Sequence, residues 1–307
     1  MHLPVLVGMG GVNAAGRTSD YQSFRRMVID VLPHAERQRT LVSLAVMMGL
    51  VSREDDDSYR EATAQATDKV LTGAEVVARY GGEVLCGTLV RRIEPAYFDV
   101  DALPWQSRAT LEPHSAGSTG DMTFILAANQ LPSVQPENWS IEAIDEKRAR
   151  ITVTGGLEVK LDNVRDFPVK AAGQLPTGFD ISKLYNSRFQ PRGLQMALFG
   201  ATDALRSMGI EWSTVLEHIQ PDQVGVYSSS GFGQMDKEGY GGMHQARMKG
   251  DRVTTKALAM GINSMPTDFI NAYVLANVGI ASSAVAACAT FLSNLRHAVA
   301  DMQAGKI

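Results

Sequence analysis

The sequence predicts an α/β fold, in which helices pack on a sheet. Two apolar segments, 4–12 and 223–233, run into glycine- or serine-rich turns, which is typical of buried strands. Segments with apolar residues three or four positions apart, such as 188–208, alternate with these strands. Because strands that alternate with helices form sheets covered by helix layers, we expect an α/β domain.

Length and composition narrow the classes of protein. At 307 residues the chain exceeds the roughly 100–200 residues of one domain, so it holds one large domain or a core with an insertion. Its net charge of −4 gives no reason to expect nucleic acid, and no apolar run is long enough for a membrane span. Two cysteines, Cys86 and Cys288, cannot build a disulfide framework, which favours a reducing cytoplasm. There, Asn138-Trp139-Ser140 is a chance match to the glycosylation motif.

The first half of the chain is predicted to be mainly helical. The strand at 4–12 leads through a glycine turn into the helix “YQSFRRMVIDVL”, and both “RQRTLVSLAVMMGLV” and “SREDDDSYREATAQATDKVLTGAEVVARYGG” suit helices. Residues 139–164 alternate apolar and polar side chains, which predicts a β-hairpin or small meander with Gly155-Gly156 as one turn. We therefore expect 35–165 to be an inserted subdomain of helices and a β-hairpin.

The second half has a more regular pattern. An amphipathic helix is predicted over 188–208, ended by Gly209. “QVGVYSSSGFG” predicts a strand followed by a Ser/Gly loop, “SMPTDFINAYVLANVG” a helix, and “IASSAVAA” a short buried strand. The last helix places six apolar side chains on one face: Phe291, Leu292, Leu295, Ala298, Val299 and Met302.

Several features that could suggest a ligand site have simpler explanations. A dinucleotide fingerprint starting at Gly8 would need glycine at position 13, where this chain has Asn13, so a plain turn is expected. The acidic run at 54–57 lacks the alternating ligands of a calcium loop and predicts a solvated helix start. The six histidines show no metal-ligand spacing, so no metal is implied. Cys86, in “GEVLCGTLV”, is expected to be a small buried residue within a strand.

Cys288 lies where a run of small and β-branched residues gives way to the last helix. Its neighbours Ala286, Ala287 and Ala289 allow a tight strand-to-helix turn that leaves the sulfur approachable. At the first turn of a helix, unpaired backbone N–H groups favour thiolate over thiol and can form part of an oxyanion hole. This is the arrangement of a nucleophile elbow, built with cysteine and alanine. From the residues alone, a nucleophile and a buried helix-start cysteine are both open.

The segment “SSAVAACATFLSNLRHAVADMQAGK” resembles the nucleophile region of the β-ketoacyl-ACP synthases, the condensing enzymes of fatty-acid synthesis. Other segments resemble parts of that family in the same order: “PVLVGMGGVNAAGRTSDYQSFRRMVIDVL”, “GQLPTGFDISKLYNSRFQPRGLQMALFGATDALRSMGI”, “VGVYSSSGFGQMD” and “DRVTTKALAMGINSMPTDFINAYVLANVGI”. The resemblance covers 1–34 and 166–307, which we expect to form one domain. The stretch 35–165 is unlike the ordinary elongation enzymes and indicates a divergent branch, similar to the initiating synthase of pseudomonads and their relatives.

The resemblance implies the N-terminal half of a thiolase-like fold, with layers in the order αβαβα. Cys288 would accept an acyl group as a thioester, with its backbone N–H in the oxyanion hole, and malonyl-ACP would then decarboxylate and attack. In the family two histidines, both in the second half, assist this decarboxylation. None of the six histidines here has a matching context, so we expect the complete reaction to need residues outside this chain. No cofactor is implied.

The resemblance also implies residues that bind substrate and partners. Phe232, between Gly231 and Gly233, matches a position beside the acyl chain, where its bulk favours a short primer; filling an ordinary core gap is the alternative. Lys249 and Arg252 lie in the basic segment “ARMKGDRVTTK”, which is either solvated surface or a docking patch for an acidic acyl carrier protein. Acyl-CoA is the alternative donor. The short apolar edge “IASSAVAA” and the resemblance both predict a homodimer.

Three other functions stay open. A catalytically silent chain-length partner has this fold but lacks the nucleophile. A non-enzymatic scaffold needs no exposed thiol at a helix start. A degradative thiolase also uses cysteine, but the Gly-Phe-Asp segment and the Gly-x-Gly loop favour the synthase.

Overall fold

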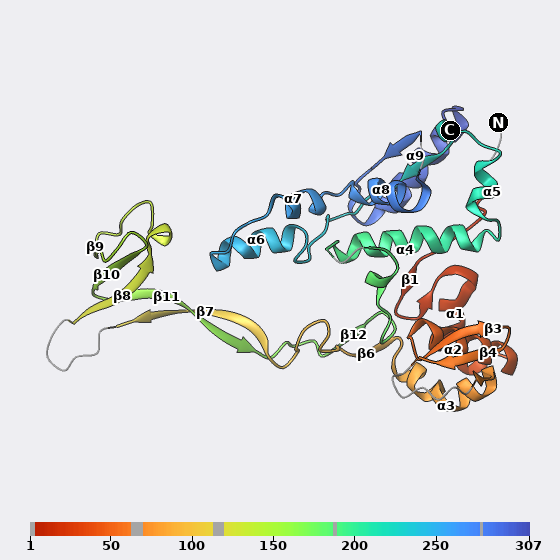
Figure 1. Ribbon diagram of the computed structural model, residues 1–307, viewed down its shortest axis with the longest axis horizontal. Helices are drawn as coiled ribbons and strands as arrows, with labels where there is room; N and C mark the ends of the chain where they lie inside the picture. Colours follow the sequence, from red (N-terminus) through yellow and green to blue (C-terminus); the bar gives the residue numbers. More distant parts are fainter. Residues whose placement is uncertain (1–3, 63–69, 113–119, 187–188, 277–278) are drawn as a thin grey trace. The chain divides into compact units, whose positions relative to one another are not determined.

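The computed structural model describes residues 4–62, 70–112, 120–186, 189–276 and 279–307, in which helices alternate with short strands (Figure 1). The chain divides into two compact units, which are treated separately below. The larger unit comprises Met1–Arg91 and Ala172–Ile307, and the smaller one comprises Arg92–Ala171. Residues 35–91 thus pack within the larger unit. An insertion at 35–165 relative to the family stays a prediction, since the compact unit has different bounds.

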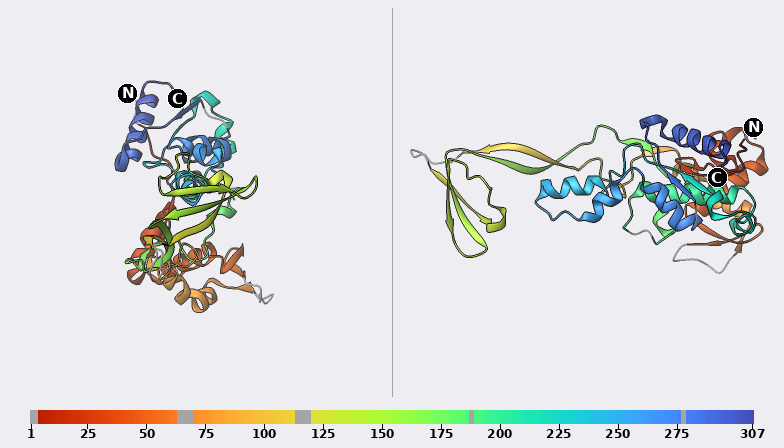
Figure 2. Two further views of the ribbon diagram at one scale, coloured as in Figure 1. Left: turned by 90° about the vertical axis from the view of Figure 1, so that its left-hand side faces the viewer. Right: turned by 90° about the horizontal axis from the view of Figure 1, so that it is seen from above.

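The smaller unit is built from antiparallel strands. They are β7 (Leu103–Leu111), β8 (Asp121–Ala127), β9 (Trp139–Ala143), β10 (Arg148–Thr154) and β11 (Leu157–Arg165), with a short 3₁₀ helix, η3 (Ala128–Gln130). β7 and β11 run side by side as a two-stranded ribbon (Figure 2), while β10 lies between β8 and β9. Side chains alternate between the faces of a strand, so Ala149, Ile151 and Val153 of β10 share one face and form the core of this unit.

The predicted strands at 139–164 are confirmed, but one predicted turn is wrong. β9 and β10 form the expected hairpin. Gly155 and Gly156 were expected to be a hairpin turn, yet β10 and β11 pair with different strands. Gly155 has φ +88, which an L-residue rarely adopts, so this glycine redirects the chain from one sheet to the other.

In the larger unit, the N-terminal part packs around two helices. Its helical elements are η1 (Ser19–Tyr21), α1 (Gln22–Met27), η2 (Ile29–Val31), α2 (His34–Met47) and α3 (Gly73–Cys86). Leu44 of α2 and Val76 and Val84 of α3 are almost fully buried in one cluster. Thr72 and Glu75 form a reciprocal capping box that fixes the start of α3. Helices at 34–47 and 73–86 confirm that part of the prediction.

Residues 51–61 form a β-hairpin, so the helix predicted there is wrong. β3 (Val51–Asp55) pairs with β4 (Ser58–Glu61), which also pairs with β5 (Val70–Leu71). Asp57, at the turn, has φ +55, a conformation that aspartate tolerates better than most residues. The acidic run at 54–57 therefore marks a strand turn, not a helix start.

The strand predicted at 4–12 is also largely wrong. Val5, Leu6 and Val7 are 68–82% exposed, and only β1 (Val12–Asn13) pairs, with β2 (Gly16–Arg17). The backbone N–H groups of this segment bond to helix side chains instead of a neighbouring strand: Met9 donates to Ser207 at 2.9 Å and Gly11 to Asp203 at 3.2 Å. Long-range contact with a helix has replaced the local preference for a strand.

The C-terminal part of the larger unit follows the predicted order of elements. Its helices are η4 (Ile181–Lys183), α4 (Arg192–Ser207), α5 (Trp212–Leu216), η5 (Pro221–Gln223), α6 (Tyr240–Lys249), α7 (Thr255–Gly261), α8 (Met265–Ile270), the π-helical turn η6 (Asn271–Leu275), η7 (Ala287–Ala289) and α9 (Thr290–Gln303). Its paired strands are β13 (Gly225–Tyr227) and β14 (Ile280–Ser282). β6 (Val90–Arg92) pairs with β12 (Ala171–Gly173). Position 188, the predicted start of the helix now seen as α4, lies outside the described residues.

Helix α4 provides most of the packing in this part. Leu194 and Leu198 are fully buried against Phe269 of α8, as the spacing of apolar residues predicts. Asp203, 2% exposed, accepts hydrogen bonds from Ser19 at 2.9 Å and Arg17 at 3.1 Å. This buried carboxylate therefore joins the two parts of the larger unit.

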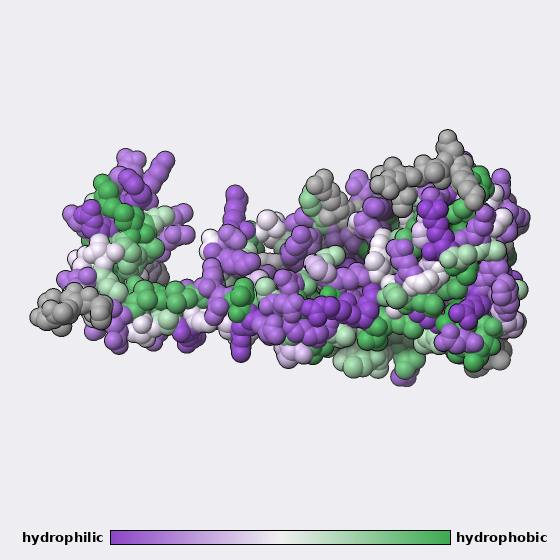
Figure 3. Space-filling view, turned by 90° about the horizontal axis from the view of Figure 1, so that it is seen from below, coloured by the Kyte–Doolittle hydropathy of each residue, from purple (hydrophilic) through white to green (hydrophobic). Residues whose placement is uncertain are grey.

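Apolar side chains also reach the surface of this structure (Figure 3). The predicted apolar face of the last helix exists on α9, but Phe291 is 75% exposed and Leu292 64% exposed. β14 is only partly buried, although a buried strand was predicted there. The spacing of apolar residues correctly predicted which side chains share a face of α9, but it did not predict that this face is exposed.

Candidate active site

The candidate site lies at the ends of two paired strands. β13 and β14 run parallel, with Val226 opposite Ala281. Because the carboxyl ends of parallel strands meet at the same edge, the loops at 228–233 and 283–288 emerge next to each other. Two segments that the sequence analysis identified separately are thus brought together.

Hydroxyl groups join these two loops. Ser283 donates to the carbonyl of Ser228 at 2.8 Å, and the Thr267 hydroxyl, on α8, also bonds to that carbonyl. Thr267 and Ser283 lie 2.8 Å apart, oxygen to oxygen. Thr267 is 2% exposed, so this network is shielded from water and fixes one loop against the other.

Cys288 lies at the predicted strand-to-helix junction. It is the central residue of η7, directly before α9, and it is exposed. Ala287 has φ +47, which costs an L-residue about 1–2 kcal/mol. The Thr290 hydroxyl accepts from the Ala286 N–H at 3.1 Å and donates to the Ala287 carbonyl at 2.7 Å. A tight, strained turn held by a helix side chain thus presents the thiol to solvent.

The Gly231–Gly233 loop lies against this turn. A Cβ added to Gly231 would stand 3.1 Å from the carbonyl oxygen of Ala287, so only glycine permits this close approach without adjustment. Gly233 has φ +72, and a Cβ there would meet the carbonyl oxygen of Gly261 at 2.4 Å. Phe232, between them, is 78% exposed. It belongs to no hydrophobic cluster within the described structure, and its role beside an acyl chain stays a prediction.

The predicted carrier-protein residues lie elsewhere on the same unit. Lys249 ends α6, and Arg252 follows the left-handed Gly250 that caps this helix. Both side chains are exposed. No hydrogen bond or ion pair in the described parts of the chain joins them to the Cys288 turn. The structure therefore brings Gly231 to Cys288 but does not group the basic residues with it.

Cys86 is not the buried strand residue that we predicted. It is the last residue of α3 and is exposed. Val84 is buried in the last turn of α3, whereas Cys86, two positions further on, faces solvent. Both thiols are accessible, so a difference in their reactivity would have to come from local chemistry.

Asn294 is the site residue that sequence reasoning missed. It is 4% exposed and bonds to both backbone groups of Ala284. The available signal was an amide, Asn294, between the apolar residues Leu292 and Leu295 of the last helix. Polar groups are rarely buried without a specific partner, so this position could have been singled out.

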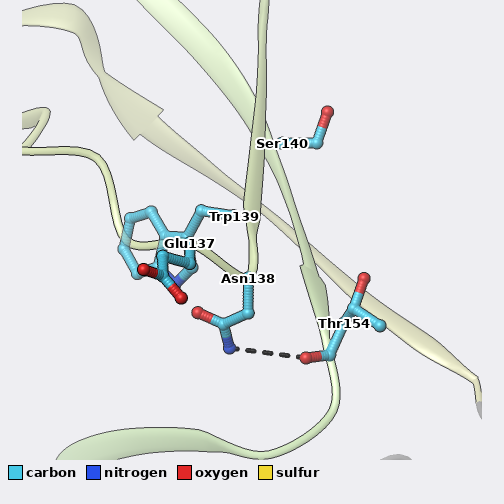
Figure 4. A pocket seen from close by; sticks show the side chains of 5 residues that line it. All are labelled: Glu137, Asn138, Trp139, Ser140 and Thr154. Atoms are coloured by element: carbon cyan, nitrogen blue, oxygen red, sulfur yellow. Dashed lines mark hydrogen bonds between the residues drawn. The ribbon is translucent and has the colours of Figure 1, made fainter.

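Two cavities lie apart from these residues. A cavity of about 430 Å³ in the smaller unit is shown in Figure 4, where Asn138 donates to the Thr154 carbonyl at 3.4 Å. The second, of about 190 Å³, lies beside α4 in the larger unit. The first is lined by Glu137, Asn138, Trp139, Ser140 and Thr154, and the second by Arg17, Leu184, Tyr185, Phe199, Thr202, Asp203 and Arg206. Neither lining includes a residue of the candidate site.

Among the residues that the structure describes, no group of three or more His, Cys, Asp or Glu side chains is placed to hold a metal ion. No helix among the same residues is both long and apolar enough to cross a membrane.

The comparisons with known proteins confirm the resemblance to the β-ketoacyl-ACP synthases and the thiolase-like α/β fold. No family model matches the chain. It is 47% identical over 304 residues to the β-ketoacyl-[acyl-carrier-protein] synthase FabY of Pseudomonas aeruginosa. This match covers 99% of the present chain and 47% of the relative. The crystal structure of the noncanonical ketosynthase FabY from P. aeruginosa matches with a TM-score of 0.86, at 47% identity, over 99% of this chain and 46% of that one. The divergent, pseudomonad-type branch is likewise supported. The chain spans about half the length of these relatives.

Proposed function

We propose that this chain carries the acyl-accepting cysteine of a β-ketoacyl-ACP synthase. The Cys288 sulfur attacks the carbonyl of an acyl thioester, the donor thiol leaves, and the acyl group remains on Cys288 as a thioester. Malonyl-ACP then loses CO₂, and the resulting carbanion attacks the Cys288 thioester. The new carbon–carbon bond forms as the sulfur is released, which yields a β-ketoacyl-ACP and free Cys288.

One observation carries this proposal: an exposed cysteine in a strained turn at the start of a fourteen-residue helix, with a glycine loop packed against it. Strained backbone persists where the surrounding structure enforces it, and it is concentrated at functional sites. The backbone N–H of Cys288 is our candidate for part of the oxyanion hole. We assign assistance of the decarboxylation to histidines outside these 307 residues, since none here matches the family context and the relatives are about twice as long.

The finer features of the proposal concern the substrate. We propose that Phe232, with Gly231 and Gly233, limits the acyl chain to a short primer. We also propose that Lys249 and Arg252 help to dock an acidic acyl carrier protein, that the protein acts as a homodimer, and that it works in the cytoplasm. Acyl-CoA is the alternative donor, and it would not need the basic residues.

The nucleophile is tested by comparing Cys288→Ala with Cys86→Ala in a condensation assay on the complete protein. Cys288→Ala should abolish both acyl loading and condensation, with an unchanged circular dichroism spectrum. Cys86→Ala is the matched control because both thiols are exposed, and it should keep near-normal activity. Full condensation by Cys288→Ala would refute the assignment and favour the scaffold. Cleavage of a β-ketoacyl-CoA by free CoA into acetyl-CoA and a shortened acyl-CoA, without malonyl decarboxylation, would favour the degradative thiolase.

Docking is tested by the double charge reversal Lys249→Glu, Arg252→Glu. The apparent KM for the carrier-bound substrate should rise, and its salt dependence should flatten, because charge steering is lost. Lys183→Glu, another exposed lysine in the same unit, is the control. Unchanged kinetics at low salt would mean that Lys249 and Arg252 belong to ordinary solvated surface.

Sedimentation of the complete protein as a monomer at micromolar concentration would contradict the homodimer.

A further inference from the structure

Asn294 is a buried amide at the centre of the Cys288 region. Its Oδ1 accepts from the Ala284 N–H at 3.0 Å, and its Nδ2 lies 3.0 Å from the Ala284 carbonyl oxygen. The same Nδ2 lies 2.8 Å from the Ser229 hydroxyl and 3.0 Å from the Thr290 carbonyl oxygen. An amide nitrogen has two hydrogens, so these three acceptors share them. The side chain is fully engaged.

These bonds replace a missing strand partner. β14 ends at Ser282, and no strand in the described part of the chain pairs with the residues that follow it. Asn294 bonds to both the N–H and the carbonyl of Ala284, as a neighbouring strand would. The Ser229 hydroxyl also donates to the Ala284 carbonyl. One junction thus ties the loops after β13 and β14 to helix α9.

The chain that leads into Cys288 is tied to helix α9 as a result. Asn294 fixes Ala284 before the turn, while Thr290 fixes Ala286 and Ala287 within it. Cys288 directly follows these anchored residues, and its side chain is exposed. Burying an amide costs free energy unless its partners are in place, so the position of Asn294 is well defined.

We propose that Asn294 is a positioning residue that holds the Cys288 sulfur in line for attack on the acyl carbonyl, with Ser229 as its support. The proposal rests on the proposed function, in which Cys288 is acylated. A nucleophile misplaced by about 1 Å can lose about a hundredfold in rate. Asn294 is only 4% exposed and bonds to protein groups, so its loss should lower kcat for acyl loading and leave KM for the donor nearly unchanged.

The test compares two reactions of the same thiol in the complete protein. Acyl loading needs alignment of sulfur and carbonyl, whereas alkylation by iodoacetamide needs mainly an accessible thiol. Asn294→Ala should slow acyl loading by about a hundredfold and change the alkylation rate of Cys288 less than about threefold. Val84→Ala, in the separate α2–α3 core, is the control for general loss of stability, and it should change neither rate when both proteins are fully folded.

A second pair of variants keeps the proposal testable if Asn294→Ala does not fold. Asn294→Asp preserves shape and the bond from the Ala284 N–H but removes the donors, and Ser229→Ala removes the support alone. Both should slow loading with unchanged KM, Asn294→Asp more strongly. Loading rates equal to wild type in folded variants, or a parallel fall in loading and alkylation, would overturn the proposal. If wild-type Cys288 accepts no acyl group at all, the proposed function fails instead, which separates the two failures.

Discussion

The left-handed backbone of Ala287 predicts a measurable store of strain beside Cys288. The residue has φ +47 and an exposed side chain, so replacing it with glycine removes almost no buried surface. Glycine adopts this conformation without the roughly 1–2 kcal/mol that alanine incurs. Against this gain, glycine adds freedom to the unfolded chain worth about 0.4–1 kcal/mol. Ala287→Gly should therefore be between equal to wild type and about 1.5 kcal/mol more stable.

Ala286→Gly is the matched control. Ala286 is exposed and adjacent but has φ −143, so glycine relieves no strain there. It should lose about 0.4–1 kcal/mol, which leaves the two variants about 1–2 kcal/mol apart. Urea denaturation of both proteins, followed by far-ultraviolet circular dichroism, measures this gap. Equal loss of stability in the two variants would refute the strain at Ala287.

Three further predictions follow from single contacts. Phe232→Ala should cost less than about 0.5 kcal/mol of folding stability because the ring is exposed. The kcat/KM of this variant should rise about fourfold for each extra methylene of the acyl donor that the enlarged pocket admits. An unchanged preference for acyl-chain length would mean that another residue closes the pocket. Burial and the hydrogen bond to Asp301 raise the pKa of Tyr227 to about 12. Because the folded pKa exceeds the unfolded value of about 10, the contribution of the neutral Tyr227 hydroxyl to folding stability is complete below pH 10 and is lost toward pH 12. Tyr227→Phe should remove that loss of stability in pH-dependent urea titrations. A Cβ on Gly10 would stand 2.1 Å from the Ala204 nitrogen, whereas one on Gly82 meets nothing within 4 Å. In thermal denaturation, Gly10→Ala should lose about 1–3 kcal/mol of folding stability and Gly82→Ala should gain about 0.5–1 kcal/mol. Equal effects of the two substitutions would contradict the packing of Gly10 on α4.

Secondary structure was predicted well where the residues that are apolar in the sequence pattern are also the ones buried in the fold. The spacing of Leu194 and Leu198 predicts α4, and both side chains are fully buried. The small-residue strand and the helix after Cys288 were likewise predicted from adjacent residues. At these positions local preference and tertiary structure agree, so the local sequence is sufficient to predict the element.

The wrong predictions depend on contacts between distant residues. The segment at 4–10 has a strand-like composition, but Gly10 packs on the backbone of Ala204, almost two hundred positions away. No local pattern reports such a contact. The hairpin at 51–61 was mistaken for a helix because charged residues cover its turn, and Asp57 adopts a left-handed conformation that sequence periodicity does not show.

The candidate site was predicted in part for the same reason. The helix-start context of Cys288 is local and made this residue a candidate, but the family resemblance was needed to favour the nucleophile and to include Gly231. Asn294 was missed because its function depends on Ala284 and Ser229, which become its neighbours only after β13 and β14 pair. A network of this kind is a property of the folded arrangement.

The central claim, that Cys288 accepts the acyl group, is tested most directly by locating the acyl adduct. The complete protein is incubated with an acetyl thioester without malonyl-ACP, digested at low pH, and analysed by peptide mass spectrometry. We predict one acetyl group on the peptide that contains Cys288, removed by neutral hydroxylamine as a thioester should be, and none on the peptide with Cys86. Acetylation of Cys86 alone, or an adduct that resists hydroxylamine, would contradict the claim.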